Sequence, residues 1–242
     1  MSRVQIGTSG WSYAHWQGPF YPAGLPRAEW LRYYARHLSS LEINASFYRL
    51  PSPDTLHEWQ RHVPADFVFA FKASRYLTHM KKLRPAPEGL ARMFACAKVL
   101  GAQLGPILFQ LPPRWHANPS RLDEFLATLP KNHRYAFELR DETWWCDAVY
   151  DILRRHDAAT VWFDMEQRRS PVVDTASFRY VRWHGPGEAA YTGRYGRNRL
   201  RPLVRHVSEW REGGQDVYIY FDNDEAGYAP VDALALQDML TD

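Results

Sequence analysis

The chain of 242 residues has very little cysteine and no long apolar segment. Its two cysteines, Cys96 and Cys146, form no C-x-x-C pair and no spacing typical of zinc sites, which excludes a disulfide framework. No apolar run reaches the roughly 20 residues that a membrane-spanning helix needs. The N-terminal residues enter a strand-like run instead of a signal peptide, so we expect a soluble cytoplasmic protein without a membrane partner.

An excess of charge of one sign is also lacking. The 30 basic and 27 acidic residues give a formal net charge of +3 and are spread along the chain, so the case for a nucleic-acid partner is weak. The chain contains neither a G-x-G-x-x-G nor a Walker A pattern, and nothing in the sequence requires a cofactor. No repeat and no linker rich in Gly, Ser or Pro divides it, and we therefore expect one domain over residues 1–242.

What the sequence does contain is a regular alternation of strand-like and helix-like segments. Short β-rich runs end at turn residues, and apolar residues recur at helical spacing between them, for example from Trp30 to Leu38. This alternation predicts parallel strands, because a parallel pair needs a crossover that is usually a helix. The eight predicted strands are residues 4–9, 40–46, 67–73, 106–111, 134–139, 160–163, 178–183 and 217–221.

Eight such strands in a chain of about 250 residues predict an α/β fold, a (β/α)₈ barrel of the TIM type with parallel strands. An open, doubly wound sheet is the alternative, but that fold would be expected to carry a Gly-rich phosphate loop. The connection between the sixth and seventh strands, through residues 167–176, is polar and interrupted by proline. We therefore expect the barrel to be irregular there.

Polar residues gather at the carboxyl ends of the predicted strands, where barrel enzymes have their active sites. Residues two apart on a strand share a face, so Glu138 should project together with Arg140, and Arg182 together with His184. These strand ends predict a polar pocket of mixed charge. The candidate catalytic residues are Glu42, Lys72, Glu138 and His184, and the candidate ligand-binding residues are Trp11, Tyr13, Asn44, Gln110, Arg140, Asp164, Arg182 and Asn223.

The charges of this pocket predict anion binding and proton transfer. Lys72, Arg140 and Arg182 would bind an anion, and the arginines could hold a phosphate or carboxylate with two hydrogen bonds each. Carboxylates that share a pocket have separated pKa values, so Glu42, Glu138 and Asp164 could supply a general acid and base. The alternative is structural: each arginine would serve only a neighbouring carboxylate in an inert buried network.

A divalent metal at Glu138, Asp164 and His184 is another use of the same groups. The neighbouring Arg140 and Arg182 would repel a cation, so we expect no bound metal.

The segment 191–199 is basic, contains two glycines and opens a predicted helix. The loops after strands seven and eight of a barrel often bind phosphate, with helix N-terminal amides as donors. The alternative is a solvated helix start rich in arginine.

Three function classes remain open. The leading hypothesis is an enzyme that acts on a small anionic ligand, with a phosphate as one candidate group. The first alternative is a nucleic-acid binding or repair protein, in which the same cations bind phosphates while Trp11, Tyr13 and Trp144 stack on bases. The second is a glycoside-processing enzyme, which would use two carboxylates and pack the rings against a sugar. The sequence gives no indication of an oligomeric state.

Nine short motifs follow one another along the chain: GTSGWSY at 7–13, FYP at 20–22, LEIN at 41–44, SFY at 46–48, TH at 78–79, QLPP at 110–113, FELR at 137–140, RWHG at 182–185 and FDN at 221–223. The set resembles the YecE-like family, the domain of unknown function seventy-two, over nearly the whole chain. This resemblance implies a TIM barrel with a pocket at the strand ends, adds His79 to the candidate ligand-binding residues, and brings no settled activity. Where the family usually has an asparagine-alanine pair, this chain has Asp232-Ala233.

Overall fold

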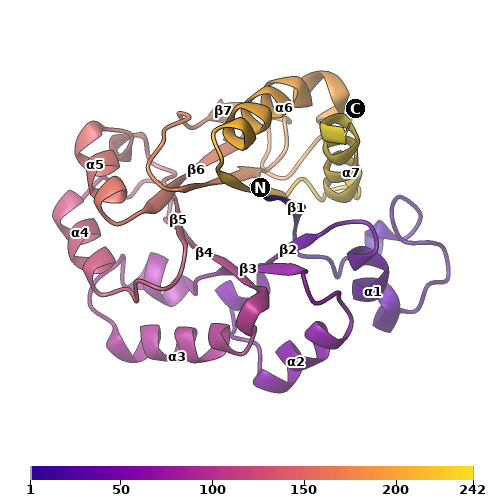
Figure 1. Cartoon of the computed structure of the whole chain (residues 1–242), viewed down its shortest axis with the longest axis horizontal. Helices are drawn as coiled ribbons and strands as arrows, with labels where there is room; N and C mark the ends of the chain where they lie inside the picture. Colours follow the sequence, from indigo (N-terminus) through magenta and orange to yellow (C-terminus); the bar gives the residue numbers. More distant parts are fainter. Residues whose placement is uncertain (1, 242) are drawn as a thin grey trace.

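The structure, a computed structural model, describes residues 2–241 and contains a closed barrel of parallel strands (Figure 1). Its eight strands are β1 (Val4–Ser9), β2 (Ser40–Ile43), β3 (Val68–Lys72), β4 (Leu104–Gln110), β5 (Tyr135–Glu138), β6 (Ala158–Met165), β8 (Phe178–Trp183) and β9 (Asp216–Phe221). Neighbouring strands pair in parallel in the order β5-β4-β3-β2-β1-β9-β8-β6, and the pairing of β5 with β6 closes the ring. The predicted (β/α)₈ barrel is confirmed.

Helices connect most of the strands and surround the barrel (Figure 1). They are α1 (Trp30–Ala35), α2 (Pro53–Arg61), α3 (Pro87–Lys98), α4 (Pro119–Ala127), α5 (Asp147–Arg155), α6 (Gly196–Glu212) and α7 (Tyr228–Thr241). Local sequence sets their starts. At α2 the hydroxyl of Ser52 accepts a hydrogen bond from the backbone N–H of Thr55 at 3.2 Å, and Pro53 takes the first helical position, where no N–H is needed.

The connection between β6 and β8 has no helix and is irregular, as the polar, proline-containing sequence predicts. The chain instead forms the two-residue strand β7 (Arg168–Arg169), which pairs antiparallel with the end of β6. Helix α6 reaches over the outer face of β6, where the rings of His206 and Trp210 lie 5.1 and 6.0 Å from that of Trp162. This long helix therefore covers part of the surface that a crossover helix would cover.

Two strand predictions differ most in length from the structure: β6 extends two residues beyond the predicted 160–163 at each end, and β2 is three residues shorter than the predicted 40–46. The predicted limits of β1 and β8 agree with the structure, whereas β2 ends at Ile43 because the chain turns into the 3₁₀ helix η3 (Ala45–Phe47). The hydroxyl of Ser46 stabilises this turn by donating to the carbonyl oxygens of Ile43 at 2.8 Å and Lys72 at 2.6 Å. The end of β2 is thereby joined to the end of β3.

The barrel interior is an apolar core of its own, separate from the layer between strands and helices. It includes the buried rings of Tyr180 on β8 and Tyr220 on β9. Side chains alternate between the two faces of a strand, so the next inward positions toward the carboxyl ends are Arg182 and Asp222. The interior thus changes from apolar to charged at the carboxyl ends of the strands.

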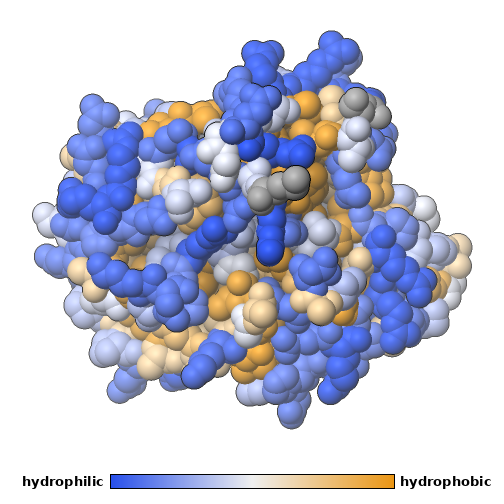
Figure 2. All heavy atoms as spheres, in the orientation of Figure 1, coloured by the Kyte–Doolittle hydropathy of each residue, from blue (hydrophilic) through white to orange (hydrophobic). Residues whose placement is uncertain are grey.

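Hydrophilic residues make up most of the molecular face seen in Figure 2, with apolar side chains between them. Among residues 2–241, no helix is both long and apolar enough to cross a membrane.

Candidate functional site

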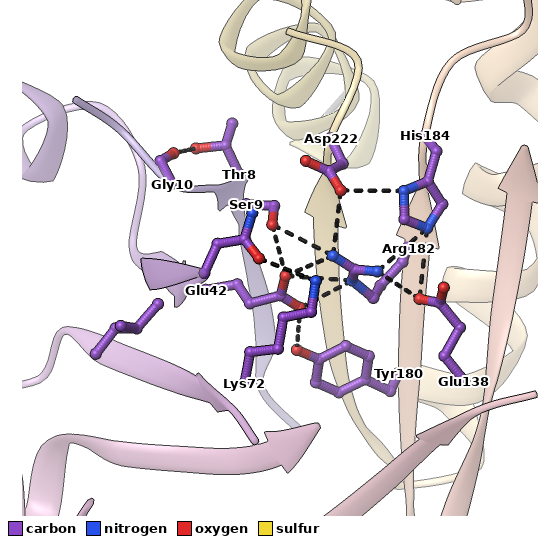
Figure 3. Close-up of polar contacts among 12 residues, drawn as sticks. Thr8, Ser9, Gly10, Glu42, Lys72, Glu138, Tyr180, Arg182, His184 and Asp222 are labelled. Carbon is purple, nitrogen blue, oxygen red and sulfur yellow. Dashed lines mark hydrogen bonds and ion pairs between the residues drawn. The ribbon is translucent and has the colours of Figure 1, made fainter. Parts of the chain in front are cut away.

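Arg182, on β8, lies at the centre of the candidate site and is completely buried. It forms a bidentate ion pair with Glu42 on β2: Nε lies 2.9 Å from Oε2, and Nη2 lies 2.7 Å from Oε1. Its Nη1 donates to Glu138, and its Nη2 also lies 3.2 Å from Oδ2 of Asp222 (Figure 3). One guanidinium therefore holds together three carboxylates, two of them on β2 and β5 and one directly after β9.

Two hydroxyl groups complete the surroundings of Glu42. Ser9 Oγ donates to Oε1 and Tyr180 Oη donates to Oε2, each at 2.7 Å. Burial and the adjacent Glu42 carboxylate raise the pKa of Tyr180 well above its ordinary value, so the phenol keeps its proton and acts as a donor. Glu42 is thus fully hydrogen-bonded inside the protein and is completely buried.

Arg140 binds the same Glu138 carboxylate from the other side. Its Nε lies 2.5 Å from Oε1 of Glu138. Burial alone would raise the pKa of Glu138, but Arg182, Arg140 and His184 together hold it well below its ordinary range. Of the three guanidinium nitrogens of Arg140, only Nε donates to an acceptor among the described residues, and Nη2 is buried without a partner.

His184 and Asp222 form a second pair beside Arg182. Nδ1 of His184 lies 3.0 Å from Oδ2 of Asp222, while Nε2 lies 3.4 Å from Oε2 of Glu138 (Figure 3). Burial would raise the pKa of Asp222, but its hydrogen bond to His184 and the charge of Arg182 lower it. The imidazole is therefore fixed between two carboxylates and is itself completely buried.

Lys72, at the end of β3, is 6% exposed and lies on the other side of this cluster. Its ammonium donates to Oδ1 of Asn44 at 2.9 Å and lies 4.6 Å from the ring centre of Phe47. Burial and the charge of Arg182 lower the pKa of Lys72 to about 8, although Glu42 acts in the opposite direction. Near neutral pH this amine is therefore close to its own titration point.

The charges of the cluster nearly cancel. Three cations, Lys72, Arg140 and Arg182, face the three carboxylates of Glu42, Glu138 and Asp222. Every nitrogen of Arg182 already has a carboxylate partner, so this residue, which the sequence suggested as a ligand-binding group, has no donor left for an external anion. The available cationic groups are Arg140 and Lys72.

A cavity of about 1050 Å³ opens beside Arg140, which we call the strand-end cavity. It lies over the ends of β5 and β6, and its lining mixes cations such as Arg114 and Arg168 with carboxylates such as Glu142. Tyr191 also borders it, and the ring of this residue lies 5.8 Å from that of His184. The cavity is large enough for a small-molecule ligand.

Five predicted binding residues lie at the same end of the barrel. Trp11, Tyr13 and Asn44 line a second cleft next to Lys72. His79 lies on the π-helical turn η4 (Tyr76–Met80), where burial, Arg140 and Lys72 lower its pKa to about 4 and so keep it neutral. Gln110 is buried at the end of β4, and its backbone pairs with that of Glu138.

Asp164 and Asn223 lie outside this cluster. On β6 the inward positions are Phe163 and Met165, so Asp164 faces the outer layer, where its Oδ2 lies 2.5 Å from Nε of Arg169. Asn223 likewise follows the inward-facing Asp222 by one residue, and its amide is directed away from the pocket. The sequence grouped both with the pocket because strand ends alone do not fix which face a residue takes.

The arrangement also bears on metal binding. Among residues 2–241, no three His, Cys, Asp or Glu side chains are grouped so as to hold a metal ion. Nη1 of Arg182 donates to Glu138 and lies 3.2 Å from Nε2 of His184, so a guanidinium already contacts both of these groups.

Comparison with known proteins identifies the family. The family model described as "Protein of unknown function DUF72" matches residues 5–242. The chain belongs to the DUF72 family.

Solved and named relatives agree with this assignment. A crystal structure of a DUF72 family protein from Thermotoga maritima has a TM-score of 0.90 and 26% identity, covering 99% of this chain and 100% of that one. A DUF72 protein from Enterococcus faecalis has a TM-score of 0.80 at 18% identity, covering 98% and 95%. The UPF0759 protein YunF of Bacillus subtilis is 22% identical over 93% of this chain and 90% of its own length. YecE of Escherichia coli is 29% identical over 57% of this chain and 48% of its own length.

In this DUF72 protein the acidic residue at position 232 has a definite structural role. The buried carboxylate of Asp232 accepts hydrogen bonds from the backbone N–H groups of Tyr195 at 2.9 Å and Gly196 at 3.0 Å, and from Nδ2 of Asn223 at 2.8 Å. These two amides begin α6, the helix whose N-terminus the sequence offered as a phosphate site. An internal carboxylate already takes those donors, so an external phosphate would have to compete with it.

Three members of the cluster were missing from the predicted site: Ser9, Tyr180 and Asp222. Tyr180 lies two residues before Arg182 on β8, Asp222 follows the inward-facing Tyr220 by two residues, and Ser9 ends β1. The period-two alternation of a strand was the signal that could have identified them.

Proposed function

We propose that this DUF72 protein is an enzyme that acts on a small anionic ligand in the polar pocket at the carboxyl ends of its strands. In this proposal, Arg140 binds the anion and Lys72 exchanges a proton with the ligand. A phosphate or a carboxylate matches the planar guanidinium, which can give two parallel hydrogen bonds.

The observation that carries the proposal is the incomplete hydrogen bonding of Arg140. Its Nη2 is buried without a partner, while the residue borders the strand-end cavity. An unsatisfied buried donor costs roughly 1–3 kcal/mol, and more for a charged group. A ligand oxygen at this position would supply the missing acceptor.

The lowered pKa of Lys72 supports the proposal that this residue exchanges a proton with the ligand. A group is an effective acid or base when its pKa lies near the working pH, and the pKa of Lys72 is lowered to about 8. Glu138, in contrast, is held as an anion by Arg182 and Arg140, so it serves to orient Arg140. The low pKa of Glu138 also argues against a glycoside-processing enzyme, whose general acid needs a raised pKa.

The test is stabilisation of the protein by inorganic phosphate, measured as the rise in melting temperature at constant ionic strength. Wild type and the control Arg169→Ala should both be stabilised, because Arg169 pairs with the outward-facing Asp164. Arg140→Ala should lose the effect. Equal stabilisation of Arg140→Ala and wild type would refute this assignment of the anion site.

A nucleic-acid partner predicts a different result. Binding of a single-stranded oligonucleotide that neutralises several phosphates would weaken steeply with salt, because counterions are released on association. Binding of that kind, together with no effect of inorganic phosphate, would favour the nucleic-acid alternative over an enzyme for a small anion.

A further inference from the structure

An aromatic cleft of about 460 Å³ lies beside the charged cluster, on the side of β1 and β2. Four rings border it, those of Trp11, Tyr13, Tyr48 and Trp59. Trp11 and Trp59 pack edge to face at a centroid distance of 4.8 Å, which fixes the orientation of the Trp11 ring. The cleft therefore has flat aromatic walls, of which the Trp11 ring is fixed by packing.

Tyr48 is the unusual member of this group. It is 74% exposed, the largest exposed fraction among the large apolar side chains of residues 2–241. It directly follows the 3₁₀ turn η3, and its ring contacts that of Phe47 only edge-on, at a centroid distance of 5.0 Å. Most of its surface at the cleft remains free to pack against another flat group.

Asn44 joins the aromatic cleft to the charged cluster. Its side chain borders the cleft and accepts the hydrogen bond from Nζ of Lys72 at 2.9 Å. Beside Lys72, Arg182 pairs with both Glu42 and Glu138, and Glu138 is the carboxylate to which Arg140 is bound (Figure 3). A ring in the cleft would thus lie next to Asn44 and Lys72, and the pairs of Arg182 connect this side of the cluster to Glu138 and Arg140.

We propose that the aromatic cleft binds a flat aromatic ring and that the ligand class of this protein is an aromatic compound bearing a phosphate or carboxylate. The ring packs on Tyr48 and Trp11, and the anionic group extends past Lys72 toward Arg140. This inference rests on the proposed function for its anionic half, whereas the aromatic half rests on the cleft alone.

The probes for this inference are phenyl phosphate, cyclohexyl phosphate and inorganic phosphate, with dissociation constants measured by titration calorimetry. Phenyl phosphate should bind wild type about two- to tenfold more tightly than cyclohexyl phosphate, since only the aromatic ring gains the stacking contribution. Tyr48→Ala should remove that difference without changing the affinity for inorganic phosphate. Tyr48→Phe should keep it, and the exposed loop variant Val172→Ala should behave as wild type.

The two proposals fail in different ways. If phenyl phosphate binds no better than cyclohexyl phosphate, or if Tyr48→Ala keeps the preference, the aromatic inference is overturned while the anion site stands. If phenyl phosphate binds in a manner that depends on Tyr48 but not on Arg140, the anion assignment fails and the aromatic cleft stands. Absence of binding by all three probes overturns both.

Discussion

Arg140 and Arg182 bind opposite oxygens of one carboxylate: Nε of Arg140 pairs with Oε1 of Glu138, and Nη1 of Arg182 pairs with Oε2. The two arginines nevertheless differ in how many of their nitrogens have a carboxylate partner. Arg182 has carboxylate partners at all three nitrogens, whereas Arg140 has one only at Nε. Glu138 therefore separates a structural half of the network from a half that is available to a ligand.

The first prediction concerns the structural half. Arg182→Met should lower the free energy of unfolding by about 3–5 kcal/mol, because it leaves Glu42 and Glu138 buried without their main counter-charge. The measurement is equilibrium denaturation in urea. Arg32→Met is the control and should change stability by less than about 1 kcal/mol, since Arg32 and its partner Glu29 are 47% and 41% exposed. Equal effects of the two variants would contradict the structural role of Arg182.

The second prediction concerns the half that is available to a ligand. Arg140→Ala should cost less stability than Arg182→Met, because Glu138 keeps its hydrogen bond from Arg182. It should weaken phosphate binding about tenfold or more, the effect of losing a hydrogen bond to a charged group. Calorimetric titration and urea denaturation of the same variant separate the two effects. A large loss of stability with unchanged phosphate affinity would mark Arg140 as structural.

Alternation and strand-end polarity were enough to predict the barrel and most of the charged cluster. Glu42, Glu138 and Arg182 follow directly from the rule that residues two apart share a face. For Asp164 the rule is not enough, because it does not say which residues of β6 face inward. The structure shows that Phe163 and Met165 pack inside the barrel, so Asp164 between them faces outward. Whether a hydrogen-bond donor of an arginine finds an acceptor depends on distances between strands that are far apart in sequence. The unpaired donor of Arg140 could therefore not be predicted.

The third prediction is a pH dependence that originates in Lys72. Its pKa in the folded protein, about 8, lies below the value of roughly 10.4 for an unfolded chain. The folded state therefore disfavours the charged amine, and the contribution of Lys72 to stability is present above pH 10.4 and is lost as the pH falls through about 8. As the pH falls from about 10.4 to about 8, the unfolding free energy of wild type should decrease by about 3 kcal/mol relative to that of Lys72→Met.

Direct titration gives an independent check of that value. In protein labelled with ¹³C at the lysine side chains, the Cε resonance assigned to Lys72 should titrate near pH 8. The same measurement on Lys72→Met identifies this resonance, because it should be missing from the spectrum of the variant. A Lys72 resonance that titrates near the unfolded-chain value of roughly 10.4 would remove the basis for assigning proton transfer to this residue.

The fourth prediction tests the acidic residue at the start of α6. Asp232→Asn should lower the unfolding free energy by about 1–3 kcal/mol. The two carboxylate oxygens of Asp232 accept hydrogen bonds from Tyr195, Gly196 and Asn223, whereas an amide has only one acceptor oxygen. Thermal or urea denaturation measures the loss. The outward surface variant Glu209→Gln on the same helix should be nearly neutral. Unchanged stability of Asp232→Asn would show that the helix start tolerates an unpaired donor.

The pairing of β1 with β9 has a consequence for how the protein is made. Val4 pairs with Val217 and Thr8 with Phe221, so β1 lies between two strands of which one is synthesised among the last parts of the chain. Until β9 leaves the ribosome, the nascent sheet has an open edge at β1. Arg182 likewise emerges before its partner Asp222, so we expect the ring to close, and the charged cluster to form, only after β9 has been translated.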